Sequence, residues 1–124
     1  MKSRTWNIDK VSPAIVRATR HQFTRALREI GYSEVAVEAG TLILGELLAN
    51  ACEHGLVPVR IELSNVGERW RLTVDDAGYG IRRPLMRDPN SLRGRGFEII
   101  ERLGATLNIA PPPRSTVQVL LPER

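Results

Sequence analysis

Hydrophobic positions along this 124-residue chain switch between the period of a strand and that of a helix. Residues 3–8 alternate weakly around Trp6 and Ile8, which predicts a first strand. Ser12-Pro13 is a typical helix start, because serine caps the helix and proline loses no hydrogen bond at the first helical position. Helical spacing then continues to Gly31 through Val16, Thr19, Phe23, Ala26, Leu27 and Ile30. We therefore predict a helix between Pro13 and Gly31, with its arginines largely on the other faces.

A second helix is predicted from a cap at Ser33 to Gly55, where glycine can adopt the left-handed conformation that ends a helix. Its apolar residues surround most of its circumference: Val35, Val37, Leu42, Ile43, Leu44, Leu47, Leu48 and Ala51. A helix with this pattern is expected to be buried on several sides. The polar residues that it carries therefore require an explanation.

Strand periodicity returns after residue 56. Val57 to Ser64 and Trp70 to Asp76 alternate on either side of a turn at residues 65–68, which predicts a hairpin. Residues 77–96, rich in Gly, Pro, Arg and Asn, are expected to form a long loop. A short third helix is predicted at residues 97–103, ended by Gly104, and two last strands at residues 106–110 and 115–121. The order predicts one α+β domain over residues 1–124, a two-layer sandwich in which three helices cover one face of a mixed sheet of about five strands.

Composition narrows the class of protein. Hydrophobic residues make up 42% and charged residues 26% of the chain, which is typical of a folded globular domain. No uninterrupted apolar run is long enough to span a bilayer and the first residues do not resemble a signal peptide, so we expect a cytoplasmic protein that does not bind membranes. The single cysteine, Cys52, excludes an internal disulfide and a CxxC site.

The net charge of +4 would fit a polyanionic partner, but its distribution argues against nucleic acid. Residues 1–31 hold seven Lys/Arg and two acids, whereas residues 32–81 hold three Arg and eight acids. Aromatic residues are only 5% of the chain, too few for the stacking platforms of single-strand binders. The arginines of the first helix form either a solvated face or a docking surface for an acidic protein partner.

The second helix carries a polar stripe on its otherwise apolar surface. Glu46, Asn50 and His54 follow one another at intervals of four residues, with Glu53 beside them. Burying such groups unpaired costs a few kcal/mol each, so they must meet a ligand, a metal ion, water or one another. One interpretation is a polar network at the end of the helix. The other is a catalytic site, in which the acid takes a proton and the neutral amide oxygen binds a hard cation.

The hairpin and the segment before the third helix supply two further candidates. Trp70, Leu72 and Val74 share the parity expected to point inward, and Asp76 falls on the same parity, where it could accept a hydrogen bond from the exocyclic amine of adenine. The alternative is that Asp76 only starts a turn. Gly94-Arg95-Gly96 precedes the third helix and closes a basic loop that suits a polyphosphate, since glycine-rich turns at helix N-termini present free N–H groups to phosphate. A GxG before a helix is also a common turn.

Together and in this order, the three segments resemble the nucleotide site of the GHKL ATPase superfamily, which contains gyrase-type topoisomerases, heat-shock chaperone ATPases, mismatch-repair proteins and histidine kinases. The segment from Glu46 to His54 is similar to the N box of that superfamily, Asp76 to Gly80 to its first glycine box, and Gly94 to Phe97 to its second. The resemblance covers residues 33 to about 120. The compact length, the form of the N box and the short lid are most similar to the bacterial anti-sigma-factor serine/threonine kinases and switch kinases.

This resemblance implies a Bergerat fold, Mg-ATP (ATP with Mg²⁺) as cofactor, a homodimer, and phosphorylation of a serine on a small antagonist protein of the STAS type. By position, Glu46 resembles the general base, Asn50 the Mg²⁺ ligand and Asp76 the adenine reader. Further nucleotide contacts are implied for His54, Gly78, Gly80, Arg93, Gly94, Arg95, Gly96, Phe97 and Thr116. Before Thr116 the chain has Arg114-Ser115, where the family usually has a glycine.

The leading hypothesis is therefore an ATP-dependent serine/threonine protein kinase that regulates transcription by partner switching with an antagonist and a sigma factor. Two alternatives remain open: a module that binds Mg-ATP and a protein partner without transferring phosphate, and a detached ATPase domain of the histidine-kinase type. The sequence names neither the sigma factor, nor the antagonist, nor the upstream signal.

Overall fold

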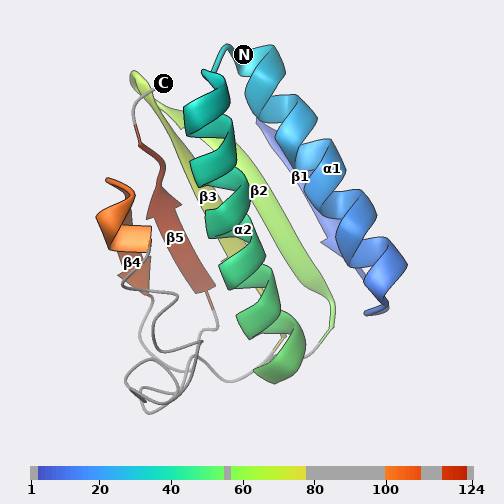
Figure 1. Ribbon diagram of the computed structural model, residues 1–124. Coiled ribbons are helices and arrows are strands. Elements are labelled where there is room, and N and C mark those ends of the chain that lie inside the picture. Colours follow the sequence, from blue (N-terminus) through green and yellow to red (C-terminus); the bar gives the residue numbers. More distant parts are fainter. Residues whose placement is uncertain (1–2, 55–56, 78–99, 110–115, 123–124) are drawn as a thin grey trace.

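The computed structural model describes residues 3–54, 57–77, 100–109 and 116–122 (Figure 1). Its elements in chain order are β1 (Arg4–Ile8), α1 (Pro13–Ile30), α2 (Glu34–His54), β2 (Val59–Val66), β3 (Arg69–Asp75), β4 (Thr106–Ile109) and β5 (Thr116–Leu120). A further helical turn covers residues 100–102. The strands form one five-stranded sheet in the order β1-β2-β3-β5-β4, and α1 and α2 lie on the same face of it. The predicted α+β two-layer fold is confirmed.

Helix α1 begins and ends where its sequence signals predict. The Ser12 side chain accepts a hydrogen bond of 3.1 Å from the Ile15 N–H, and Pro13 occupies the first helical position. Gly31 adopts φ 103°, so the residue that ends the helix is in the left-handed region that favours glycine. The predicted apolar face is buried except for Val16, which is partly buried against the core.

Helices α1 and α2 pack closely in an antiparallel pair. A Cβ atom built at Gly40 would lie 2.6 Å from Cδ1 of Leu27, so only glycine fits there without displacing a neighbour. The hydroxyls of Thr24 and Thr41 form a 2.9 Å hydrogen bond between the two helices. Farther along the pair, a Cβ at Gly45 would meet the guanidinium of Arg20 at 3.6 Å, an ordinary contact.

Helix α2 is less enclosed than its composition predicts. Leu44, Leu47 and Leu48 are buried in the core, but Val35 is 79% exposed and Leu42 is 43% exposed. These two residues are seven positions apart and therefore share one face of the helix. By length and composition alone, residues Glu34–Cys52 could cross a membrane. The burial of Leu44, Leu47 and Leu48 in the hydrophobic core is typical of a core helix instead.

The sheet is antiparallel in every pairing among the described strands, so the mixed sheet expected from the sequence is wrong in this respect. The reason lies in the connection between β1 and β2. It contains two helices of similar length, and the second returns the chain to the end of the sheet from which the first departed. A strand that follows such a helical hairpin must run opposite to the strand before it, whereas a single crossover helix gives a parallel neighbour.

The strands β2 and β3 of the hairpin have the predicted lengths but are shifted by two residues and one residue, and the turn between them is shorter than predicted. Pairing continues to Val66↔Arg69, which leaves only Gly67 and Glu68 in the turn. Gly67 has φ 65°, the conformation that a two-residue hairpin requires at its first position. Gly104, which the sequence predicts as the end of the third helix, likewise has a positive φ of 85°.

The two ends of the described chain lie at the same end of the sheet (Figure 1). The Leu121 N–H donates to the Trp70 carbonyl at 2.8 Å. The Arg69 guanidinium donates twice to the Leu121 carbonyl, at 2.7 Å and 3.2 Å. These bonds fix the end of the last strand beside the start of β3. The opposite end of β3, where Asp75 and Asp76 follow Val74, is therefore distant from both chain ends.

Candidate functional site

The predicted polar stripe lies on the second half of α2, which runs across the sheet toward the end of β3 (Figure 1). Asn50 is only 8% exposed, one of three buried polar or charged residues among those that the structure describes. Glu46, one turn earlier, is half-buried and makes no hydrogen bond or ion pair within the described part of the chain. The helix thus offers an available carboxylate next to a buried carboxamide.

Asp76 is half-buried and follows β3 directly. Leu72 and Val74 are buried in the core between sheet and helices, so alternation directs Asp75 to the helix-free face of the sheet and Asp76 to the helix side. The pKa of the Cys52 thiol supports this assignment. It is raised above its usual value of 9.0, first by burial and second by the negative charge of Asp76. Since Cys52 lies on α2, the Asp76 charge is close enough to that helix to act on it, in agreement with the alternation.

Thr116 does not join this group. It pairs with Asp75 in the register of β3 and β5, and its hydroxyl donates a hydrogen bond to the Asp75 carboxylate. Both side chains therefore lie on the face of the sheet away from α2. A signal in the sequence was available: Val117, Val119 and Leu121 alternate as buried residues, which directs Thr116 outward. The proximity of Cys52 to Asp76, in contrast, has no signal in the sequence, because it depends on how α2 crosses the sheet.

The remaining candidates lie outside the described residues. These are Gly78, Gly80, Arg93, Gly94, Arg95, Gly96 and Phe97, together with the loop and most of the third helix predicted around them. His54 is the last residue of α2. The structure thus places Glu46 and Asn50 on the second half of α2 and Asp76 directly after β3. The nucleotide contacts expected of the glycine-rich segments stay predictions.

The donor atoms on the second half of α2 suit a cation that is shared with a phosphate ligand. A carboxylate and a carboxamide one turn apart provide oxygen ligands, which Mg²⁺ prefers. Among the described residues there is no group of three or more His, Cys, Asp or Glu that could hold a metal ion alone. Mg²⁺ commonly binds through one or two protein ligands plus substrate phosphates, so Asn50 fits this ion together with a nucleotide.

Comparison with known protein families decides between the interpretations of these segments. A family model described as "Histidine kinase-like ATPase domain" matches residues 10–119, nearly the whole chain. The chain belongs to this family. The resemblance to the GHKL superfamily is thereby confirmed, and the polar stripe on α2 and the end of β3 belong to a GHKL-type ATP-binding domain.

A solved structure agrees with this assignment of the ATPase domain. The histidine kinase domain of the blue-light activated histidine kinase EL346 from Erythrobacter litoralis superposes with a TM-score of 0.60 and 22% sequence identity. The match covers 86% of this chain but only 60% of that one, and at this identity it shows the fold alone. A search of curated proteins gives no match.

Proposed function

We propose that this ATPase domain is an anti-sigma-factor-like serine/threonine kinase, which transfers the γ-phosphoryl group of ATP to a serine of a STAS-type antagonist and regulates by partner switching. The proposal rests on the environment of Glu46. Its carboxylate is half-exposed and unpaired within the described chain, one turn from the buried Asn50. A module that only bound nucleotide would not need a free carboxylate at this position.

The proposed chemistry assigns one step to each residue. Glu46 orients the serine hydroxyl and takes its proton while the serine oxygen bonds to the γ-phosphorus and the bond from that phosphorus to the β–γ bridging oxygen breaks, which releases ADP. Asn50 holds Mg²⁺, which when bound neutralises the charge of the phosphates. Asp76 accepts a hydrogen bond from the adenine amine and fixes the base.

Replacing Glu46 by Gln tests the catalytic assignment. Gln keeps the shape and the hydrogen bonding of the side chain but cannot accept the proton, so phosphotransfer should slow by about a hundredfold to ten-thousandfold while ATP affinity is retained. Glu38→Gln, a change at an exposed acid on the same helix, is the matched control and should have the wild-type rate. Single-turnover assays with labelled ATP and STAS-type antagonists measure the rate, and calorimetry measures the affinity.

Two outcomes contradict the kinase. The first is phosphotransfer by Glu46→Gln at the wild-type rate. The second is a wild-type protein that binds ATP well but transfers phosphate to none of the antagonists. After the second outcome we would adopt the alternative of a non-catalytic module, which binds Mg-ATP and a protein partner with the same fold but has no working general base.

The exposed surface of α1 is a candidate binding site for the antagonist. Arg17 and Arg20 are exposed, and the Arg20 guanidinium lies over Gly45, the residue before Glu46. We propose that these arginines are the docking surface for an acidic partner rather than a solvated face. A partner held there would lie close to the turn of α2 that carries the proposed general base.

Reversing both charges tests this surface. Arg17→Glu together with Arg20→Glu should leave ATP affinity unchanged and weaken binding of the acidic antagonist, and wild-type association should slow as the salt concentration rises. Arg102→Glu, at an exposed position beside β4, is the control for a charge reversal elsewhere on the surface, to be compared with each single variant, Arg17→Glu and Arg20→Glu. If the double variant binds the antagonist as tightly as wild type, the arginines are solvated surface.

The homodimer implied by the family is part of the same proposal. Sedimentation velocity over a range of protein concentrations, with and without Mg-ATP, tests it independently of the kinase reaction.

A further inference from the structure

Strand β1 is an edge strand that pairs with β2 alone among the described residues. In an antiparallel pair, alternate residues direct both N–H and C=O toward the partner and the residues between them direct theirs away. The outer side of β1 therefore carries main-chain donors and acceptors that no other described strand uses. Such an edge is a template on which a further strand can pair.

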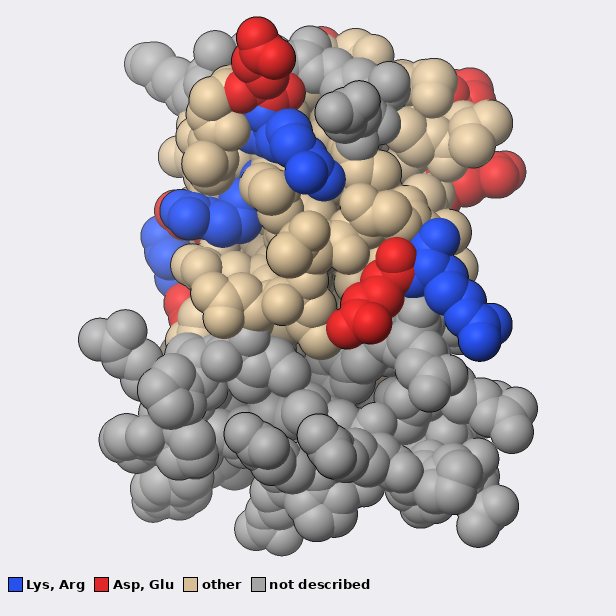
Figure 2. Space-filling model, turned by 90° about the vertical axis from the view of Figure 1, so that its left-hand side faces the viewer, with Lys and Arg blue, Asp and Glu red and all other residues tan. Residues whose placement is uncertain are grey.

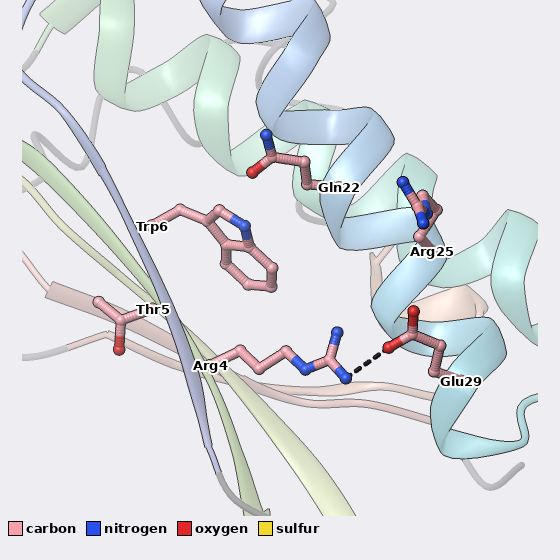
Figure 3. A pocket seen from close by; sticks show the side chains of 6 residues that line it. All are labelled: Arg4, Thr5, Trp6, Gln22, Arg25 and Glu29. Atoms are coloured by element: carbon pink, nitrogen blue, oxygen red, sulfur yellow. Dashed lines mark hydrogen bonds and ion pairs between the residues drawn. The ribbon is translucent and has the colours of Figure 1, made fainter.

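A groove of about 520 Å³ lies beside this edge, between β1 and α1 (Figure 3). It is lined by Arg4, Thr5, Trp6, Gln22, Arg25 and Glu29. The Trp6 indole is partly buried against the core, where it meets the Phe23 ring edge-on at 6.0 Å between centroids, and its remaining surface lines the groove (Figure 3). The groove thus combines a strand edge with an apolar aromatic surface.

The charges in the groove favour an acidic occupant. Arg4 forms an ion pair with Glu29 at 2.5 Å, so these two charges neutralise each other. Arg25 lines the groove without a hydrogen bond or ion pair within the described part of the chain. An unpaired guanidinium beside a partly apolar groove attracts a carboxylate, and the hydrogen bonds between such groups are among the strong ones.

The other edge of the sheet lacks these features. Figure 2 looks onto the side of β4, where the described surface is mostly uncharged and the charges present are of both signs. β4 has only four residues, one fewer than β1. Of the two edges, the β1 edge therefore combines an available strand with an aromatic surface and a cation that has no partner within the described residues.

We propose that the groove between β1 and α1 binds an extended acidic segment of a partner protein as an added strand, with a carboxylate on Arg25 and an apolar side chain on Trp6. Alternate side chains of a strand point to the same face and lie about 6.6 Å apart, twice the rise per residue. The segment recognised therefore carries its acidic and its apolar residue on the same face, an even number of positions apart. The site is separate from the nucleotide site and does not depend on the kinase.

A second copy of β1 is a poorer occupant on grounds of charge. The strand Arg4–Ile8 contains one cation and no acid. A second β1 on the same edge would therefore bring no carboxylate to Arg25, whose guanidinium would stay unpaired. Charge complementarity selects a different, acidic strand.

A synthetic peptide tests the proposal on the whole protein. The probe is a labelled ten-residue peptide in which one face alternates aspartate with valine and the other carries threonine, and its binding is followed by fluorescence anisotropy. Arg25→Glu should weaken binding at least about tenfold. Arg102→Glu makes the same change of charge outside the groove and should leave the affinity unchanged. Thermal unfolding verifies that both variants are folded.

Backbone methylation of the peptide tests pairing by strand addition. N-methylation at every second residue should abolish binding in one phase, where the N–H groups face β1, and have little effect in the other phase. The proposal is overturned if no such peptide binds, if both methylated series bind alike, or if Arg25→Glu binds as wild type does. It is also overturned if sedimentation velocity shows a dimer that an excess of peptide cannot dissociate and that prevents the peptide from binding, because a second copy would then fill the groove.

Discussion

Asp75 and Asp76 are adjacent carboxylates in different environments. Asp75 accepts a hydrogen bond from Thr116 on the helix-free face of the sheet. The charge of Asp76 acts on Cys52 of α2, on the other face. Successive side chains of a strand point to opposite faces of the sheet. The Asp75 carboxylate therefore stabilises the sheet, whereas the carboxylate of the next residue, Asp76, is available to a nucleotide.

Alanine substitution at these two positions should therefore give different results. Asp76→Ala should weaken ATP binding roughly tenfold to a hundredfold, because a charge-assisted hydrogen bond to the adenine amine is lost. Asp75→Ala should retain the affinity and lower the free energy of unfolding by about 1 kcal/mol, the usual value of one lost hydrogen bond. Calorimetric titration and denaturant unfolding measure the two quantities. Equal losses of ATP affinity in the two variants would refute the assignment of faces.

The Cys52 thiol gives a control that needs no nucleotide. Because the Asp76 charge contributes to the raised thiol pKa, Asp76→Ala should lower that pKa and speed alkylation of Cys52 near pH 8. Asp75→Ala should not change the rate. Neither substitution removes α2 or the sheet that bury the thiol, so the expected difference in rate between the two variants comes from the Asp76 charge.

For single residues, the sequence predicted which face of a helix or strand a side chain occupies where the regular spacing of that element is enough to determine it. Helical spacing put Glu46 and Asn50 on one stripe, and strand parity put Asp76 on the helix side. It failed at Val35 and Leu42, which were expected to be buried and are exposed. An apolar residue shows that a site can be buried, but which side of a helix meets the sheet depends on the packing of the whole domain.

At the scale of elements, the contact of α1 with α2 depends on two glycines in different surroundings. Gly40 is pressed against Leu27, which is fully buried, whereas Gly45 meets only the flexible end of Arg20. Both lie inside a helix, where alanine is intrinsically favoured over glycine by about 1 kcal/mol. The environment of each glycine decides whether that gain is realised.

Alanine at the two glycines should change stability in opposite directions. Gly40→Ala should lower the free energy of unfolding by about 1 kcal/mol, because overpacking against Leu27 outweighs the gain in helix propensity. Gly45→Ala should raise it by about 0.5 to 1 kcal/mol. Urea unfolding of both variants measures the difference. Stabilisation by both substitutions would mean that the helices are less closely packed than the structure shows.

The ends of the helices were more predictable than the sheet. Ser12 and Gly31 act within one turn of the residues they cap, so a short stretch of sequence is enough to identify them. The strand boundaries shifted by up to two residues, because pairing with the neighbouring strand decides where a strand ends. The antiparallel direction of β1 and β2 follows from the two helices between them, and only the path of the whole connection shows it.

At the scale of the whole molecule, nucleotide binding should be visible as thermal stabilisation. A ligand present at a hundred times its dissociation constant stabilises a protein by about 2.7 kcal/mol. For a domain of 124 residues this corresponds to an increase of Tm on the order of 10 °C. Differential scanning fluorimetry with Mg-ATP, with Mg-ADP and without nucleotide measures it. No shift with either nucleotide would contradict a functional ATP site.

The metal ion should act only with the nucleotide. Mg²⁺ alone should give no measurable shift, since the described residues contain no cluster that could hold it. ATP in the presence of a chelator should stabilise the wild-type protein less than Mg-ATP does. In Asn50→Ala this difference between the two conditions should shrink, because the protein ligand of the ion is removed.

The position of both chain ends at one end of the sheet determines how the domain responds to mechanical force. Tension applied between Ser3 and Pro122 acts on β1 and β5 at the same end of the sheet. Its direction is perpendicular to the strands, so it separates neighbouring strands sideways and does not slide them along one another. The hydrogen bonds of the outer pair β1 and β2 then carry the load one after another, as in the opening of a zipper, and not all at once. At the other end of the chain, the bonds of Arg69 and Trp70 to Leu121 would be the first to bear it. The strand end that carries Asp76 would feel the force last.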